Sequence, residues 1–216
     1  MGKEDRRGKR KLRGQFGNKR VPELGYYYIV TDTDQTEKNY LEGLKSALPS
    51  HIRDKIVIKV EYASTSELVA KCRNGASLHP QHSEPWIVFD CDRVVDFDKI
   101  IEEAKNSGIH VGWSNPCFEI WLYAYFGEMP THYDSVSCCK KFAYLYEKKT
   151  SQEYKKSFKN LYSKLKQYGD EAKAISIAKQ KYNEQIREEN SIPSKMFSCT
   201  TMHLLIGEIQ QKIEEK

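Results

Sequence analysis

Four aspartates follow two separate apolar segments of this 216-residue sequence, and their spacing suggests metal chemistry. Asp32 and Asp34 come directly after the first apolar segment, and Asp90 and Asp92 come after the third. Carboxylates that meet at one place repel one another and raise the pKa of at least one member. A bound Mg²⁺ or Mn²⁺ removes this conflict, because both ions prefer oxygen ligands and bind beside substrate phosphates. The two D-x-D patterns together therefore predict a divalent metal site.

A structural interpretation of the first pattern also stands, because Asp and Thr are common at the starts of helices. Asp34 or Thr36 could cap the helix that is expected to follow. In the chemical interpretation, Asp34 or Glu37 orients an attacking water as a general base. The presence of two D-x-D patterns, rather than one, favours the chemical interpretation.

A second polar block, at residues 114–119, follows the fourth apolar segment. Pro116 restricts Asn115 to extended backbone, so Asn115 is expected to face the same edge as the aspartates. Glu119 lies in an otherwise apolar helix, where a carboxylate needs a partner. It either complements the helix terminus or belongs to the site, and the sequence leaves both open.

Short apolar segments alternate with amphipathic ones over the first half of the chain. Strands are predicted at 26–31, 56–62, 86–89 and 109–113, and helices at 36–47, 65–73 and 97–106. This alternation is typical of βαβ units, in which helices cover both faces of a parallel sheet. The carboxyl ends of parallel strands share one edge, which is where the aspartates are expected to meet.

From Cys117 onward the apolar spacing is helical to the last residue. We therefore predict an α/β fold with a mostly parallel, four-stranded sheet flanked by helices, followed by a helical region. The expected organisation is a basic disordered tail (1–20), an α/β domain (21–128) and a helical C-terminal region packed on it (129–216).

Charge is unevenly distributed along the chain. Residues 1–20 hold nine Lys or Arg and two acidic residues, a net charge of +7, whereas the remaining residues carry 26 basic and 28 acidic groups. Such a tail is suited to contact phosphate backbones or an acidic surface, or it serves mainly as a solvated arm.

The composition excludes a membrane-spanning protein, because no apolar stretch approaches the roughly 18 residues that a spanning helix needs. The tail lacks the apolar segment of a secretory signal, so a cytoplasmic protein is expected. The six cysteines form no C-x-x-C pair and no His-flanked spacing. We therefore expect reduced thiols without a zinc or disulfide role.

Four blocks of the sequence resemble the RloB-like family. They are I-V-T-D-T-D-Q-T-E-K-N-Y-L-E-G-L at 29–44, V-F-D-C-D at 88–92, W-S-N-P-C-F-E-I-W-L at 113–122 and C-T-T-M-H-L-L at 199–205. The blocks span nearly the whole chain after the tail. The S-N-P-C-F-E block, with its spacing to the second D-x-D, is the most specific of them.

The resemblance implies a Toprim-like fold in which Asp32, Asp90 and Asp92 hold Mg²⁺ or Mn²⁺. It also implies cleavage of DNA or RNA, tRNA included, within a phage-defence or abortive-infection system, often with an ATPase partner. The histidine of the closing block makes His203 a further site candidate. Under this hypothesis Asp32, Asp34 and Glu37 are the catalytic residues.

The chain departs from the family at the first block, where Asp32-Thr33 replaces the usual Glu-Gly. This departure supports an alternative, a non-catalytic Toprim-like protein that binds nucleic acid or a partner ATPase. In a second alternative, D-T-D-Q-T at 32–36 is the nucleophile loop of a haloacid dehalogenase-like phosphatase. In that case Asp32 is phosphorylated, Asp34 is the acid and base, and Ser114 holds the phosphoryl group.

Overall fold

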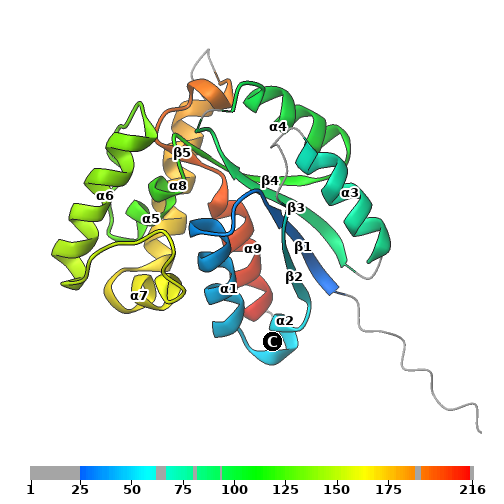
Figure 1. Ribbon diagram of the computed structural model, residues 1–216, viewed down its shortest axis with the longest axis horizontal. Coiled ribbons are helices and arrows are strands. Elements are labelled where there is room, and N and C mark those ends of the chain that lie inside the picture. The colour runs from blue at the N-terminus through cyan, green and yellow to red at the C-terminus, as the bar shows by residue number, and fades with distance from the viewer. Residues whose placement is uncertain (1–24, 62–66, 80–81, 93, 188–190, 215–216) are drawn as a thin grey trace, which may run out of the picture.

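The computed structural model describes residues 25–61, 67–79, 82–92, 94–187 and 191–214, and Figure 1 shows its arrangement. The predicted disordered tail (1–20) lies outside the described residues. The strands are β1 (Gly25–Thr31), β2 (Ile56–Val60), β3 (His82–Asp90), β4 (His110–Asn115) and β5 (Cys199–Thr200). The helices of the first half are α1 (Thr36–Ala47), α2 (Ser50–Arg53), α3 (Leu68–Leu78) and α4 (Phe97–Asn106). Those of the second half are α5 (Glu119–Tyr125), α6 (Ser135–Thr150), α7 (Leu161–Tyr168), α8 (Glu171–Ile186) and α9 (Met202–Glu214).

Within the described residues the sheet has five strands in the order β2-β1-β3-β4-β5, and the first four are parallel. The predicted α/β class and the mostly parallel sheet are therefore confirmed. The predicted count of four strands is wrong, because β5 pairs antiparallel with β4 at the sheet edge. A two-residue strand is too short to show the alternation by which strands are recognised in a sequence.

Alternating side chains of β1 enter two different cores, as expected for a strand covered on both faces. Tyr28 and Val30 pack with residues of α3 and α4. Tyr27 and Ile29 pack with residues of α1, α5 and α9 on the opposite face. Figure 1 shows α3 and α4 on one side of the sheet, and α1, α5 and α9 on the other.

The second of these cores extends from the sheet through the helical C-terminal region. Trp121 of α5 is fully buried in it, together with Phe142 of α6, Leu165 of α7 and Ile209 of α9. The helices of residues 129–216 therefore pack on the sheet through one continuous apolar core. None of the helices in the described ranges is long and apolar enough to cross a bilayer.

Candidate functional site

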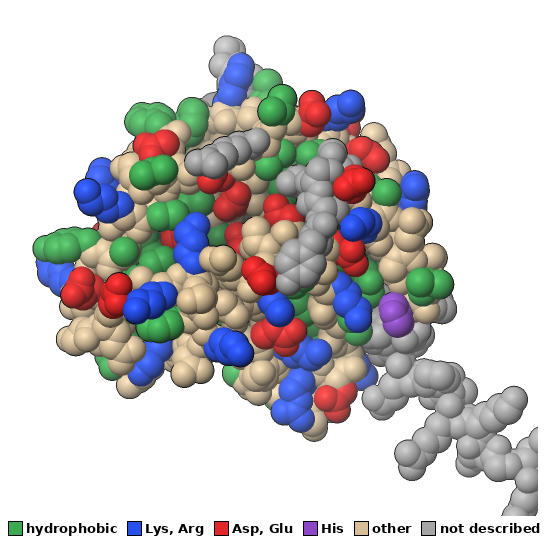
Figure 2. Space-filling view, viewed as in Figure 1, with side chains coloured by type: hydrophobic (Ala, Val, Ile, Leu, Met, Phe, Trp, Pro, Cys, Tyr) green, Lys and Arg blue, Asp and Glu red, His purple; other side chains and the backbone are tan. Residues whose placement is uncertain are grey.

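An open cavity of about 440 Å³ lies at the carboxyl edge of the sheet, where β1 and β3 end side by side. Its lining consists mainly of acidic and hydroxyl side chains: Asp32, Thr33, Asp34, Gln35, Thr36, Glu37, Asp90, Asp92 and Lys156. Figure 2 shows acidic side chains gathered in a hollow near the middle of the viewed face. The cavity thus contains every residue that the sequence proposed as a catalytic or metal-binding group.

The strand register brings the two D-x-D patterns together. Thr31, the last residue of β1, pairs with Val88 of β3, so Asp32 and Asp90 leave neighbouring strands at nearly the same level. Both side chains are partly buried, whereas Asp92 is exposed. The backbone amide of Asp92 donates a 3.2 Å hydrogen bond to Oδ1 of Asp90, which fixes the turn after β3.

Glu37 enters the same cavity from the first turn of α1. The N-cap position of α1 is Gln35, whose side chain makes no capping hydrogen bond. Thr36 is the first residue of the helix and its buried hydroxyl has no hydrogen-bond partner, so the prediction that Thr36 caps this helix is wrong. Glu37 is 4% exposed, and its Oε2 accepts a 2.5 Å hydrogen bond from the Thr33 hydroxyl. The Thr33 hydroxyl thereby holds the Glu37 carboxylate in place.

The carboxylates of the cavity perturb one another's protonation. Burial raises the pKa of Asp90 well above its usual value, and the charges of Glu37, Asp32, Glu119 and Asp92 raise it further. Burial likewise raises the pKa of Glu37 from 4.5 to about 7, against the lowering effect of the Thr33 hydrogen bond. The negative charge of Asp32 adds to the increase. The site therefore concentrates more negative charge than it can stabilise on its own.

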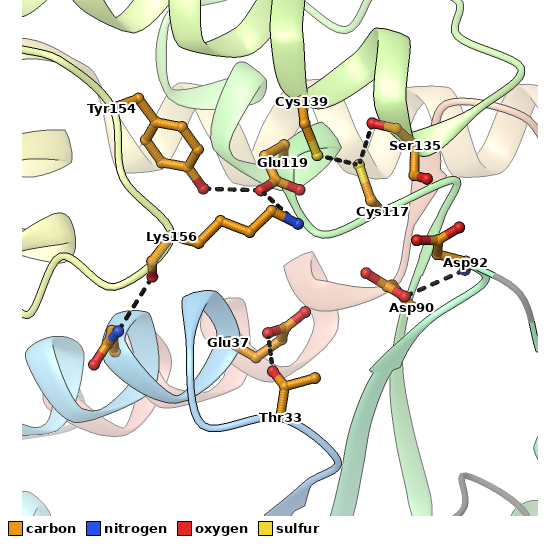
Figure 3. Close-up of polar contacts among 11 residues, drawn as sticks. Thr33, Glu37, Asp90, Asp92, Cys117, Glu119, Ser135, Cys139, Tyr154 and Lys156 are labelled. Atoms are coloured by element: carbon orange, nitrogen blue, oxygen red, sulfur yellow. Dashed lines mark hydrogen bonds and ion pairs between the residues drawn. The ribbon is translucent and has the colours of Figure 1, made fainter.

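Glu119 is a fully buried carboxylate beside this cavity. Its Oε1 accepts a 2.9 Å hydrogen bond from the Tyr154 hydroxyl and lies 3.4 Å from Nζ of Lys156. Its Oε2 is buried and has no hydrogen-bond partner. Figure 3 shows Lys156 extending toward Glu119, with Asp90, Asp92 and Glu37 nearby. Glu119 is thus held by side chains and linked to the cavity through Lys156, which lines it.

The remaining sequence candidates do not enter the cavity. Ser114 is fully buried and shares a 2.9 Å hydrogen bond with the Thr200 hydroxyl. Asn115 donates two 3.0 Å hydrogen bonds from Nδ2 to the backbone carbonyls of Pro193 and Ser194. Ser114 therefore joins β4 to β5, and Asn115 joins β4 to the segment at 193–194.

The His203 side chain also has its contacts within the fold rather than in the cavity. Its Nδ1 lies 3.0 Å from the Thr200 carbonyl oxygen, and burial lowers the pKa of the ring to about 4. The ring packs against Tyr182, with 5.5 Å between ring centroids. His203 therefore stays neutral at physiological pH and supports the start of α9.

The cavity has several of the features that a divalent metal ion requires. Asp32, Asp90 and Asp92 line it together, yet a different set forms the one tight cluster of possible ligands among the described residues. That cluster is Cys117, Glu119 and Cys139, whose ligand atoms all lie within 4.8 Å of one another. Mg²⁺ usually keeps several waters and takes only one or two carboxylates, so the carboxylate-rich lining and crowded negative charge fit such an ion.

Lys156 and Tyr154 were not found from the sequence. Both lie in residues 151–160, between α6 and α7, where the chain has no regular apolar spacing. The sequence around them is notable only for its many lysines, and a Lys-rich stretch more often indicates the solvated side of a helix than a binding site.

Comparison with known proteins identifies one match. The family model described as RloB-like protein matches residues 27–209, which is most of the chain. No curated protein and no solved structure matches the chain. The resemblance expected from the four sequence blocks is therefore confirmed.

Proposed function

The chain belongs to the RloB-like protein family, and from this membership and the acidic cavity we propose that it is a metal-dependent nuclease. The proposed reaction is hydrolysis of a phosphodiester bond in DNA or RNA. The observation that carries the proposal is the environment of Asp90, a partly buried carboxylate whose pKa is raised by burial and by four neighbouring carboxylates. A cation would relieve that repulsion, and an open cavity leaves room for a substrate phosphate.

Asp32, Asp90 and Asp92 would hold Mg²⁺ or Mn²⁺. When bound, the ion would polarise a phosphoryl oxygen and lower the pKa of a coordinated water. Glu37, with its pKa near 7, can accept a proton at Oε at neutral pH, and the Thr33 hydroxyl orients it for that purpose. Asp34 is exposed on the rim, where it can orient water at the mouth of the cavity.

Positive charge for a nucleic-acid backbone is available at two places. Lys156 lines the cavity with its side chain 46% exposed. Residues 1–20 carry a net charge of +7. Contacts of this kind strengthen binding to any sequence and weaken as salt increases.

The test compares cleavage by matched variants. Plasmid, single-stranded DNA and tRNA are incubated with the purified protein in Mg²⁺ or Mn²⁺, alongside Asp90→Ala and Asp54→Ala. Asp54 is 73% exposed and precedes β2 at the opposite edge of the sheet, so its replacement controls for loss of a surface aspartate. We expect cleavage by the wild type and Asp54→Ala, with a loss of at least about 100-fold in Asp90→Ala. Equal cleavage by all three proteins would refute the proposal.

A second measurement separates the enzyme from a non-catalytic binding protein. Calorimetric titration with Mn²⁺ should give heat with the wild type and much less with Asp90→Ala. Absence of heat, together with retained nucleic-acid binding, would instead favour the binding protein suggested by Asp32-Thr33. The phosphatase alternative has less support, since the hydroxyl of Ser114 is buried against Thr200 rather than in the cavity.

We further propose that the sheet is Toprim-like and that the protein acts in phage defence, as family membership suggests. The four parallel strands and the acidic groups at the ends of β1 and β3 are consistent with a Toprim-like unit. A partner ATPase stays a prediction of the family resemblance.

A further inference from the structure

Two thiols and a carboxylate meet beside the acidic cavity, in the cluster of Cys117, Glu119 and Cys139. Cys117 lies two residues before α5 begins at Glu119, and Cys139 lies early in α6. The two sulfur atoms are 3.7 Å apart, and the possible ligand atoms of all three residues lie within 4.8 Å of one another. Two segments 22 residues apart in the sequence thus bring three metal-ligating groups into one place.

The sulfur separation matches the geometry of a thiolate metal centre. Two thiolates that each lie about 2.3 Å from a tetrahedral zinc ion are about 3.8 Å apart. The observed 3.7 Å is close to that spacing. The fold therefore holds Cys117, just before α5, and Cys139 of α6 at the separation that such an ion requires.

The second observation concerns the unsatisfied oxygen of Glu119. The Glu119 side chain is 1% exposed, and Oε2 is buried without a hydrogen-bond partner. Figure 3 shows this oxygen on the side of the carboxylate that faces the sulfur atoms of Cys117 and Cys139. A buried carboxylate oxygen without a partner is costly, and a cation between it and the thiols would satisfy it.

The other oxygen of Glu119 is already fixed. Oε1 accepts the Tyr154 hydroxyl hydrogen bond and the Lys156 ion pair, which hold the carboxylate in one orientation. Hydrogen bonds to a ligand from outside the metal shell commonly orient it in this way. Cys139 is partly exposed, so an ion can reach the cluster from solvent.

We propose that Cys117, Cys139 and Oε2 of Glu119 bind a divalent cation of the zinc class. Thiolate ligands select such ions over Mg²⁺, so this site differs in chemistry from the oxygen-lined cavity. Three protein ligands leave a fourth tetrahedral position for water or another ligand. The ion would join α6 to the start of α5, beside the wall of the acidic cavity. This inference does not depend on the nuclease proposal.

The test uses Co²⁺ as a spectroscopic substitute on the reduced, full-length protein under anaerobic conditions. We expect one equivalent of Co²⁺ to produce a thiolate-to-cobalt charge-transfer band, and Zn²⁺ to abolish it. Cys139→Ser and Cys117→Ser should lose the band, and competition with a chromophoric chelator should show Zn²⁺ affinity at least about 100-fold weaker in each. Circular dichroism establishes that each variant is folded.

Two controls make the result specific. Cys91→Ser removes a partly exposed cysteine that is outside the cluster, and Asp90→Asn removes the central carboxylate of the acidic cavity. Both should keep the cobalt band, and Asp90→Asn separates this site from the nuclease site. A folded wild type without the band, or a band that persists in Cys139→Ser, would overturn the proposal. Loss of two thiols on peroxide treatment, without a cobalt band in the reduced protein, would also overturn it in favour of a disulfide pair.

Discussion

Nζ of Lys156 lies 3.4 Å from Oε1 of Glu119, and this ion pair joins the α6–α7 connection to the first turn of α5. The pair is asymmetric, because the Glu119 side chain is 1% exposed and that of Lys156 is 46% exposed. The buried carboxylate therefore depends on a partner that reaches it from solvent. Burial is the largest single influence on the pKa of Lys156, and it lowers that pKa. Attraction to Glu119, together with smaller contributions from neighbouring groups, outweighs burial, so the pKa is raised overall.

Replacing Lys156 by Met should lower the free energy of unfolding by about 1 kcal/mol, since the partly exposed partner is screened by water. Lys155→Met is the matched control, because Lys155 pairs with exposed Glu153 and its replacement should have almost no effect on stability. Urea unfolding of a double-mutant cycle checks the pair: Lys156→Met should cost much less stability in a protein that already carries Glu119→Gln than in the wild type. Strict additivity of the two substitutions would show that the pair contributes nothing.

Asp90→Asn should stabilise the protein in the absence of divalent cations. The amide is nearly the same size as the carboxylate, and it removes one charge from a group of mutually repelling carboxylates. We expect a gain of about 1 kcal/mol, or a rise in Tm of about 2–4 °C, by thermal unfolding in EDTA at pH 8. Adding Mn²⁺ should stabilise the wild type more than the variant. A lower Tm for the variant in EDTA would contradict this account.

Glu37 should make stability depend on pH. Its folded-state pKa of about 7 lies above its ordinary value of 4.5, so folding favours the protonated form. Its contribution to stability is therefore fully present below pH 4.5 and is lost as pH rises through 7. Urea unfolding in EDTA should show that Glu37→Gln removes about 2–3 kcal/mol of the difference between pH 4.5 and pH 8. The same pH profile in both proteins would disprove the assignment.

Tyr125→Phe tests a buried hydrogen-bond network in the core. The Tyr125 hydroxyl donates a 2.7 Å hydrogen bond to Oε2 of Glu171 and lies 2.7 Å from the Tyr40 hydroxyl. Its removal leaves two buried polar groups with one partner fewer, so we expect a loss of about 1–3 kcal/mol. Tyr144→Phe is the control, because Tyr144 is 71% exposed. Cleavage activity measured well below the unfolding temperature should be unchanged by either substitution.

The sequence predicted the parts of the site that depend on local pattern. Asp32 and Asp90 were found because each follows an apolar strand, and parallel strands bring such positions to one edge. The cluster of Cys117 and Cys139 was not expected, because thiols 22 residues apart on different elements form no recognisable ligand spacing. Lys156 was missed because it lies on an irregular segment whose position depends on tertiary packing.

Ser114 and Asn115 illustrate the opposite error. Both were correctly placed near the end of β4, but neither β5 nor the position of residues 193–194 beside β4 was predicted, so the hydrogen-bond partners of the two side chains were unknown. Ser114 is hydrogen-bonded to Thr200 of the edge strand, and Asn115 to backbone carbonyls of the segment that precedes this strand.

The apolar core beneath the cavity crosses the boundary at residue 128 that the apolar spacing of the sequence suggested between the two regions. Tyr27 of β1 and Ile209 of α9 belong to the same buried cluster, and the Thr201 hydroxyl accepts a hydrogen bond from the amide of Trp113 in β4. Neither half can be exchanged for that of a relative unless the facing side chains are transplanted with it. Divergence among relatives in these helices should accordingly be matched by compensating changes on the sheet.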